Sequence, residues 1–131
     1  MRRIRSKGMA PELAVRSLVH RLGHRFRLHR RDLPGTPDLV FPKAKAVIFV
    51  HGCFWHQHSR CRDGRVPSSN KDYWSPKLET NVARDRRNRR RLRRLGWTVL
   101  TIWECEIKDL ERVGVRIVGF LEDARLRDSS G

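Results

Sequence analysis

The chain has 131 residues, with 30 Lys and Arg residues against 14 Asp and Glu residues, a formal net charge of +16 and a sequence pI of about 11.4. This length fits one compact domain spanning 1–131, and no apolar run approaches the ~20 residues that a membrane-spanning helix needs. The positive charge favours an acidic partner, with nucleic acid as the leading candidate. Hydrophobic residues make up 38% of the chain but gather in short runs, which excludes wholesale disorder.

The N-terminal part of the chain predicts an arm followed by a helix. Residues 1–10 are basic and short of large apolar side chains, so we expect an arm that lies along a phosphate backbone. Over 11–22, apolar residues recur at helical spacing between Pro11 and Gly23. This pattern predicts a helix over 11–22.

Three strands and a long loop are expected next. Short segments rich in β-forming residues, separated by Pro and Gly, predict strands over 25–29, 38–41 and 46–50. Residues 51–70 show no periodicity and contain His, Cys, Pro and Gly, so they predict a loop. Long loops in small domains are often functional.

The C-terminal half predicts two helices around one strand. A helix is expected over 75–95, with an Arg-rich outer face and Gly96 as its C-terminal stop. The run at 97–103 predicts a strand buried on both faces, and a last helix is expected over 109–126. The order of elements indicates an α/β fold in which helices flank a mixed sheet.

Thiol and imidazole groups cluster in the predicted loop. Cys53, His58 and Cys61 are close in sequence, and Cys105 comes just beyond the last predicted strand. A tetrahedral Cys₃His zinc site of structural type would use all three cysteines and tie the loop to that strand. The alternative is that Cys53 and Cys105 are small buried apolar residues and Cys61 is a surface thiol.

A second group of residues has the chemistry of phosphodiester hydrolysis. Asp38 begins one predicted strand and His51 ends the next, so pairing of the two strands would bring them to one edge, within reach of Glu12. Carboxylates that hold Mg²⁺, together with His51 or His56 to move a proton, suffice for this reaction. The alternatives are an Asp38 that caps a turn and a Glu12 that favours a helix N-terminus.

Two further features suit contact with DNA. Phe54 and Trp55 stand together in a polar loop, where they can either wedge between base steps or pack around the zinc. The segment 84–94 contains eight arginines and a single acid, Asp85. Such a run is ordinarily a solvated helix face, but like charges at this density repel one another unless a polyanion lies nearby, which favours phosphate contact.

The sequence resembles the very-short-patch mismatch repair endonucleases (Vsr) along nearly its whole length. The matching segments are PEL followed by R and HRLG, then GTPDLVF, AVIFVHGCFWHQH, the downstream Cys61, and NVARDRRNRRRLRRLGWTVLTIWEC. The resemblance implies a restriction-endonuclease-like three-layer fold of the PD-(D/E)xK superfamily, with a structural zinc site. It also implies a Mg²⁺-dependent nick in one DNA strand, 5′ to the thymine of a T:G mismatch.

The resemblance also assigns roles to individual residues. Asp38 matches the metal-binding aspartate and Glu12 the helix acid that supports the metal. His51 and His56 match the catalytic histidines, and the base and acid roles stay open between them. The remaining assignments are the zinc ligands Cys53, His58, Cys61 and Cys105, the intercalating residues Phe54, Trp55 and Met1, and the phosphate-contacting Arg86, Arg87 and Arg90.

Three features depart from the family pattern. Val50 stands where the best-known member of the family has threonine, and we expect Val50 to bind Mg²⁺ through its main-chain carbonyl. The spacing between His58 and Cys61 is longer by one residue. The longer arm that precedes Met1 in relatives is absent from the sequence, so we expect a weaker grip on DNA.

The expected partner is double-stranded DNA with a T:G mismatch, alongside other mismatch-repair proteins. We expect a monomer in the bacterial cytoplasm, associated with the nucleoid when bound to DNA, with Mg²⁺ for catalysis and Zn²⁺ for structure. Two alternatives stay open: a zinc-stapled DNA-binding module without catalysis, and a general duplex nuclease of the same fold.

Overall fold

The computed structural model describes residues 10–53 and 71–130. In chain order the elements are α2 (Pro11–Arg21), β1 (Arg27–Leu28), β2 (Leu39–Phe41), the 3-10 helix η1 (Pro42–Ala44), β3 (Ala46–His51), α3 (Lys71–Arg94), β4 (Thr98–Trp103), the 3-10 helix η4 (Glu104–Lys108) and α4 (Leu110–Ser130). Within these residues, no helix is both long and apolar enough to cross a membrane.

The strands form one mixed sheet in the order β1-β2-β3-β4. β1 pairs with β2, and β2 with β3, in antiparallel fashion, whereas β3 and β4 run parallel. The long connection that contains α3 makes the parallel pairing possible, because parallel neighbours need a crossover. The expected mixed sheet is therefore confirmed, and the C-terminal ends of β3 and β4 meet at one edge.

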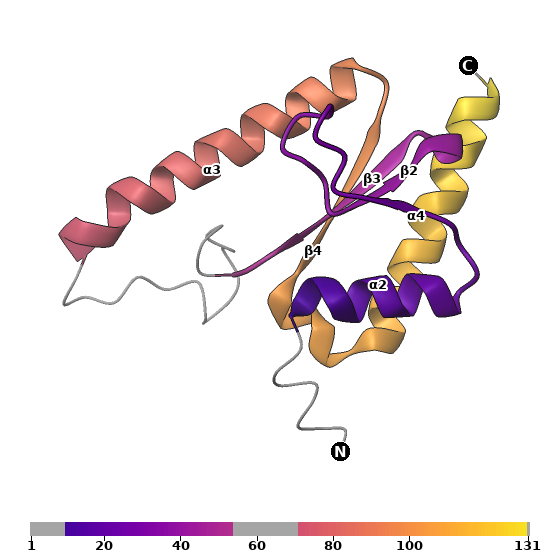
Figure 1. The fold of residues 1–131 in the computed structure, drawn as a ribbon, viewed down its shortest axis with the longest axis horizontal. Coiled ribbons are helices and arrows are strands. Elements are labelled where there is room, and N and C mark those ends of the chain that lie inside the picture. Colours follow the sequence, from indigo (N-terminus) through magenta and orange to yellow (C-terminus); the bar gives the residue numbers. More distant parts are fainter. Residues whose placement is uncertain (1–9, 54–70, 131) are drawn as a thin grey trace.

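Helices cover both faces of this sheet, which gives three layers (Figure 1). On one face, α2 and α4 pack against alternate strand residues such as Leu39, Ile48 and Ile102. On the other face, Leu92 of α3 packs against the intervening residues, including Val47. Successive side chains of a strand point to opposite faces, so the alternating apolar residues fill both cores.

The predicted strand over 25–29 is reduced to two exposed residues, Arg27 and Leu28. His29 ends this strand because its φ angle of 46° lies in the left-handed region, where an extended ladder cannot continue. The helix predicted over 11–22 begins and ends within one residue of the observed α2.

The expectation that the strand over 97–103 is buried on both faces was wrong. In β4 only Ile102 is buried, and the other residues are partly exposed. The physical reason is its position at the edge of the sheet, where one side lacks a neighbouring strand. α3 begins four residues before the predicted start at 75 and ends as expected, with Gly96 in the left-handed region at φ 94°.

Candidate active site

Asp38 lies directly before β2, where pairing with β3 holds it beside Val50. The main-chain N–H of Val50 donates a hydrogen bond to Asp38 Oδ2 at 2.7 Å. The antiparallel register, with Leu39 opposite Ile48, sets this contact. The sheet therefore fixes one carboxylate oxygen and leaves the other, Oδ1, for a second partner.

Burial raises the pKa of Asp38 above its ordinary value, because a partly desolvated carboxylate is less stable in its charged form. The negative charge of Glu12 raises it further, while the Val50 N–H and His29 act in the opposite direction. Since the unfavourable contributions prevail, the charged carboxylate is short of positive charge in the protein alone. A bound cation would supply that charge.

Glu12, on the first turn of α2, also lies at this site, where His29 contacts both Glu12 and Asp38. His29 Nε2 lies 3.0 Å from Glu12 Oε2 and 3.6 Å from Asp38 Oδ1. Glu12 also contacts Arg16 one helical turn later, at 3.3 Å. The three side chains Glu12, His29 and Asp38 each offer a ligand atom, and these atoms lie within 4.8 Å of one another. The expectation that Glu12 reaches Asp38 is confirmed.

His51 is the buried imidazole at the end of β3. Its ring lies 5.4 Å from that of Phe49 and 5.3 Å from that of Trp103, measured between centroids. Only 6% of the residue is exposed. Packing between two aromatic rings fixes the orientation of the imidazole toward the cavity that it lines with Asp38.

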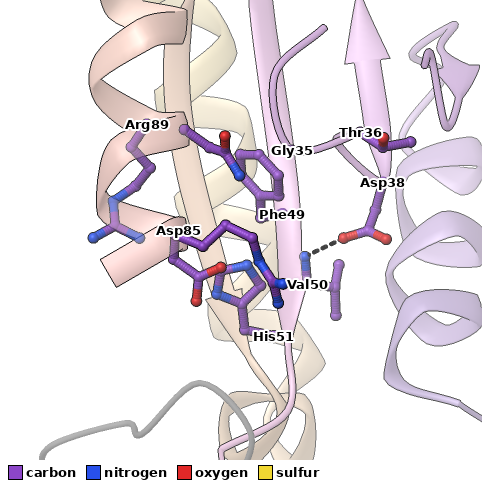
Figure 2. Close-up of a pocket in the computed structure, with 10 residues that line it drawn as sticks. Gly35, Thr36, Asp38, Phe49, Val50, His51, Asp85 and Arg89 are labelled. Carbon is purple, nitrogen blue, oxygen red and sulfur yellow. Dashed lines mark hydrogen bonds between the residues drawn. The ribbon is translucent and has the colours of Figure 1, made fainter. Parts of the chain in front are cut away.

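The site opens into a cavity of about 510 Å³ between the sheet and α3 (Figure 2). One side, the strand wall, is formed by Asp38, Phe49, Val50 and His51. The opposite side, the helix wall, is formed by Arg84, Asp85, Asn88 and Arg89 of α3. The carboxylate of Asp38 and the imidazole of His51 thus face two guanidinium groups, with the carboxylate of Asp85 beside them, across one space.

The two walls meet at Gly35. Its φ angle of 78° suits glycine, and a Cβ atom there would lie 3.1 Å from both Asn88 Nδ2 and Phe49 Cζ. On the helix wall, burial lowers the pKa of Arg89 below its ordinary value, and Asp85 opposes that shift. Partial desolvation of Arg89 leaves it short of negative charge, as Asp38 is of positive charge.

Comparison with known proteins identifies the family of this chain. The family model described as DNA mismatch endonuclease Vsr matches residues 1–62. The chain is 55% identical over 122 residues to the type II nicking enzyme V.XorIIP of Xanthomonas oryzae pv. oryzae, covering 93% of this chain and 89% of that relative. This chain belongs to the Vsr family.

Two other relatives extend the likeness within the Vsr family. The DNA mismatch endonuclease Vsr of Escherichia coli is 42% identical over 113 residues, which covers 86% of this chain and 72% of that enzyme. The type II nicking enzyme V.NmeAIP of Neisseria meningitidis is 41% identical over 128 residues, covering 95% and 90% of the two chains. The predicted family is therefore confirmed.

The donor set of the Vsr site fits a divalent cation. Glu12 and Asp38 supply carboxylate oxygens, which Mg²⁺ prefers, and both are partly accessible to solvent. Val50 contacts Asp38 through its N–H group. The role expected for the Val50 carbonyl as a metal ligand stays a prediction.

Two of the four predicted zinc ligands fall within the described residues. Cys53 is fully buried just after β3, and Cys105 is partly buried just after the parallel strand β4. The main-chain N–H of Cys53 donates to Glu104 Oε1 at 3.3 Å, so the two segments are in contact. These thiols suit zinc. His58 and Cys61 lie outside the described residues, and the zinc site stays a prediction.

Other predicted residues also lie outside the described ranges, namely His56, Phe54, Trp55 and Met1. The predicted phosphate-contacting residues Arg86, Arg87 and Arg90 are exposed on α3. Arg86 and Arg90 stand two positions on either side of Asn88, about 200° around the helix, and neither lines the cavity.

Sequence reasoning missed three residues of this site. His29 was expected only as the end of a strand, although extension of the β1–β2 register places it opposite Asp38. The positions of Arg84 and Arg89 within the arginine run did not distinguish them from their neighbours. The eight arginines are alike as residue types, so the sequence does not tell which of them face the cavity. Burial of Leu78 and Leu92, both on α3, sets the rotation of the helix and thereby decides this.

Proposed function

We propose that this protein nicks one strand of duplex DNA at a T:G mismatch, 5′ to the mismatched thymine, by Mg²⁺-dependent hydrolysis of a phosphodiester. Membership of the Vsr family supports nicking, since relatives are named type II nicking enzymes. The likeness to the DNA mismatch endonuclease Vsr supports the choice of a mismatch as substrate.

The observation that supports this function best is the pairing of opposite charges across one cavity. Asp38 and His51 line one wall, and Arg84 and Arg89 line the other. A cation bound at the strand wall and a DNA phosphate at the helix wall would each meet a need that the protein leaves unfilled. The same cavity therefore suits a divalent cation and a phosphodiester together.

Each group has a part in hydrolysis. A divalent cation held by Asp38 and Glu12 would neutralise the scissile phosphate and lower the pKa of a bound water. Arg84 and Arg89 orient the phosphate and balance the charge that develops on its oxygens. His51 takes or gives a proton at the cavity, and one of His51 and His56 acts as the general base while the other acts as the general acid. The packing of His51 between aromatic rings limits its motion.

The rest of the DNA contact lies outside the cavity. We expect Arg86, Arg87 and Arg90 to bind backbone phosphates, which positions the protein without reading sequence. Phe54, Trp55 and Met1 would intercalate beside the mismatch, where weak stacking lowers the cost of opening the duplex. Zinc bound by Cys53, His58, Cys61 and Cys105 would anchor the loop that holds the aromatic pair.

A strand-specific nicking assay tests the function. The substrates are two oligonucleotide duplexes that differ only in a T:G or a T:A pair, labelled on either strand, with Mg²⁺ or a chelator. We expect a nick in the thymine strand of the T:G duplex alone, and only with Mg²⁺. Asp38→Ala should slow it more than about 100-fold, because a metal contributes several kcal/mol and each ~1.4 kcal/mol is tenfold in rate.

Asp32→Ala is the matched control. Asp32 is exposed, in the same loop as Asp38, and its partner is Arg30 at 2.6 Å. We expect this variant to nick at the parent rate. An Asp38→Ala protein that cuts as fast as the parent would contradict the metal assignment. Equal cutting of T:G and T:A duplexes would indicate a general nuclease, and binding without any cutting would indicate a DNA-binding module.

A further inference from the structure

The candidate cation site contains an imidazole as well as two carboxylates. His29 Nε2 is 3.0 Å from Glu12 Oε2 and 3.6 Å from Asp38 Oδ1. The side chain of His29 is 45% exposed, whereas those of Glu12 and Asp38 are 27% and 21% exposed. The imidazole is therefore the most solvent-accessible of the three groups.

The backbone holds His29 in this place. Its main-chain N–H donates to the carbonyl oxygen of Asp38 at 3.4 Å, which continues the contact between β1 and β2 by one residue. The φ angle of 46° then turns the chain away from the strand. Non-glycine residues are uncommon in this region, although His, Asn and Asp enter it more readily than others. His29 is thus fixed to the residue that it faces.

The spacing of the donor atoms fits coordination of one ion. Ligands at about 2.1 Å from a metal lie about 3.0 Å apart on an octahedral edge and about 3.4 Å apart on a tetrahedral edge. The observed separations of 3.0 and 3.6 Å are close to these values, and all three donor atoms lie within 4.8 Å of one another. Small side-chain movements would bring them around an ion.

The chemistry of the three donors differs from that of an all-oxygen site. Mg²⁺ prefers oxygen ligands and retains its waters, whereas imidazole nitrogen favours first-row transition metals. A nitrogen donor therefore adds more to the affinity for a transition-metal ion than to that for Mg²⁺.

We propose that His29 is a protein ligand of the cation site, so that the site binds a divalent transition metal such as Mn²⁺ more tightly than Mg²⁺ and owes part of that preference to His29. The inference rests on the proposed function in taking this site as the catalytic cation site. It adds a ligand and a metal preference to the site.

Mn²⁺ is the probe, because its electron paramagnetic resonance spectrum reports both the amount bound and the nuclei bonded to it. In the full chain with bound Mn²⁺, we expect spin-echo modulation from a directly coordinated ¹⁴N nucleus. In His29→Asn we expect that modulation to disappear and the Mn²⁺ affinity to fall at least about tenfold, because even loss of a group that only supports a metal ligand costs about 10- to 100-fold in affinity. Mg²⁺ affinity, measured by competition, should fall much less.

Asn is chosen because it accepts the left-handed backbone of residue 29 while its side chain is too short to reach the ion. His20→Asn is the matched control, since His20 is an exposed histidine on the same helix as Glu12. It should leave the spectrum and both affinities unchanged.

The opposite result would follow if His29 only neutralises the two carboxylates as a charged partner. His29→Asn would then bind both ions equally well or more tightly, and wild-type Mn²⁺ would show no ¹⁴N modulation. Either result would overturn the inference. Absence of the modulation from the wild-type spectrum would overturn the inference even if the variant fails to fold, whereas its presence is assigned to His29 only by its loss in His29→Asn.

Failure of the proposed function gives a different outcome. A protein whose Mn²⁺ shows His29-dependent ¹⁴N modulation but which does not nick a T:G duplex would keep the inference and contradict the function. A protein that nicks with Mg²⁺ and shows no such modulation would do the reverse.

Discussion

The strand wall and the helix wall of the cavity differ in the sign of their charge but share a response to burial. Burial raises the pKa of Asp38 on the strand wall and lowers that of Arg89 on the helix wall. Each group is therefore driven toward its neutral form. A second carboxylate shows the contrast: exposed Asp32 accepts hydrogen bonds from Arg30, which hold its pKa below the ordinary value.

This difference in pKa distinguishes charged groups at a binding site from those of a structural ion pair. Asp32 and Arg30 satisfy each other at the surface, 2.6 Å apart. Asp38 and Arg89 line the same cavity on opposite walls, and each lacks the full compensation that Asp32 has. We expect a cation and a phosphate to complete them.

The sharpest test compares two pairs of arginines on α3. The double substitution of Arg84 and Arg89 by Gln removes two charges from the helix wall, and that of Arg86 and Arg90 removes two from the outer face. Both should reduce the slope of log K against log salt by about 1.8, because each phosphate contact contributes about 0.9. The cavity pair alone should also lower the nicking rate at saturating DNA, by about 1,000-fold.

The measurements are filter binding at several salt concentrations and single-turnover nicking. If the outer pair lowered the nicking rate at saturating DNA as strongly as the cavity pair, the two faces of α3 would have the same role. The distinction between the helix wall and the outer face would then be wrong.

The next largest effect concerns the contact between the two walls. Gly35→Ala should lower the free energy of unfolding by about 2–4 kcal/mol, from the left-handed backbone and from the clash with Asn88 and Phe49. Gly23→Ala should cost only about 1–2 kcal/mol, because Gly23 shares the positive φ but has no atom within 4 Å of an added Cβ. Urea unfolding measures both. Equal losses of unfolding free energy in the two variants would mean that Asn88 and Phe49 accommodate the added Cβ without any loss of stability.

The smallest effect is on stability at the strand wall. Because the folded-state pKa of Asp38 is raised, the native protein binds more protons than the unfolded chain between the two pKa values, and stability falls as pH rises through that window. Above that pH window, Asp38 is charged in both the folded and the unfolded state, and its burial lowers the stability by the full amount. Asp38→Asn should therefore unfold a few degrees higher than the parent at pH 8, and the difference should vanish in acid.

Asp32→Asn serves as the control for thermal unfolding, since the pKa of Asp32 is lowered and its charged form is already favoured. This variant should unfold no higher than the parent at pH 8. Added Mg²⁺ should stabilise the parent and leave Asp38→Asn unchanged, because only a protein with the site intact gains from binding. An Asp38→Asn protein less stable than the parent at pH 8 would contradict the burial argument.

Much of the fold was predictable because it depends on local patterns. The helix that begins at Pro11 and the strands that end at Phe41 and His51 follow from apolar periodicity and from Pro and Gly. Asp38 and His51 were predicted to reach the same edge, since antiparallel pairing of adjacent strands fixes their register. The degree of burial of β4 was not predictable, because the same apolar run suits a central and an edge strand.

The sequence by itself determined the residue types of the site, the Vsr family and the order of helices and strands. Only the tertiary structure decided that His29 stands between Glu12 and Asp38, and that Arg84 and Arg89 rather than Arg86 and Arg90 face the cavity. The reason is physical. Local patterns record which side chains prefer burial, whereas contacts between distant segments depend on strand register, helix rotation and a single left-handed residue.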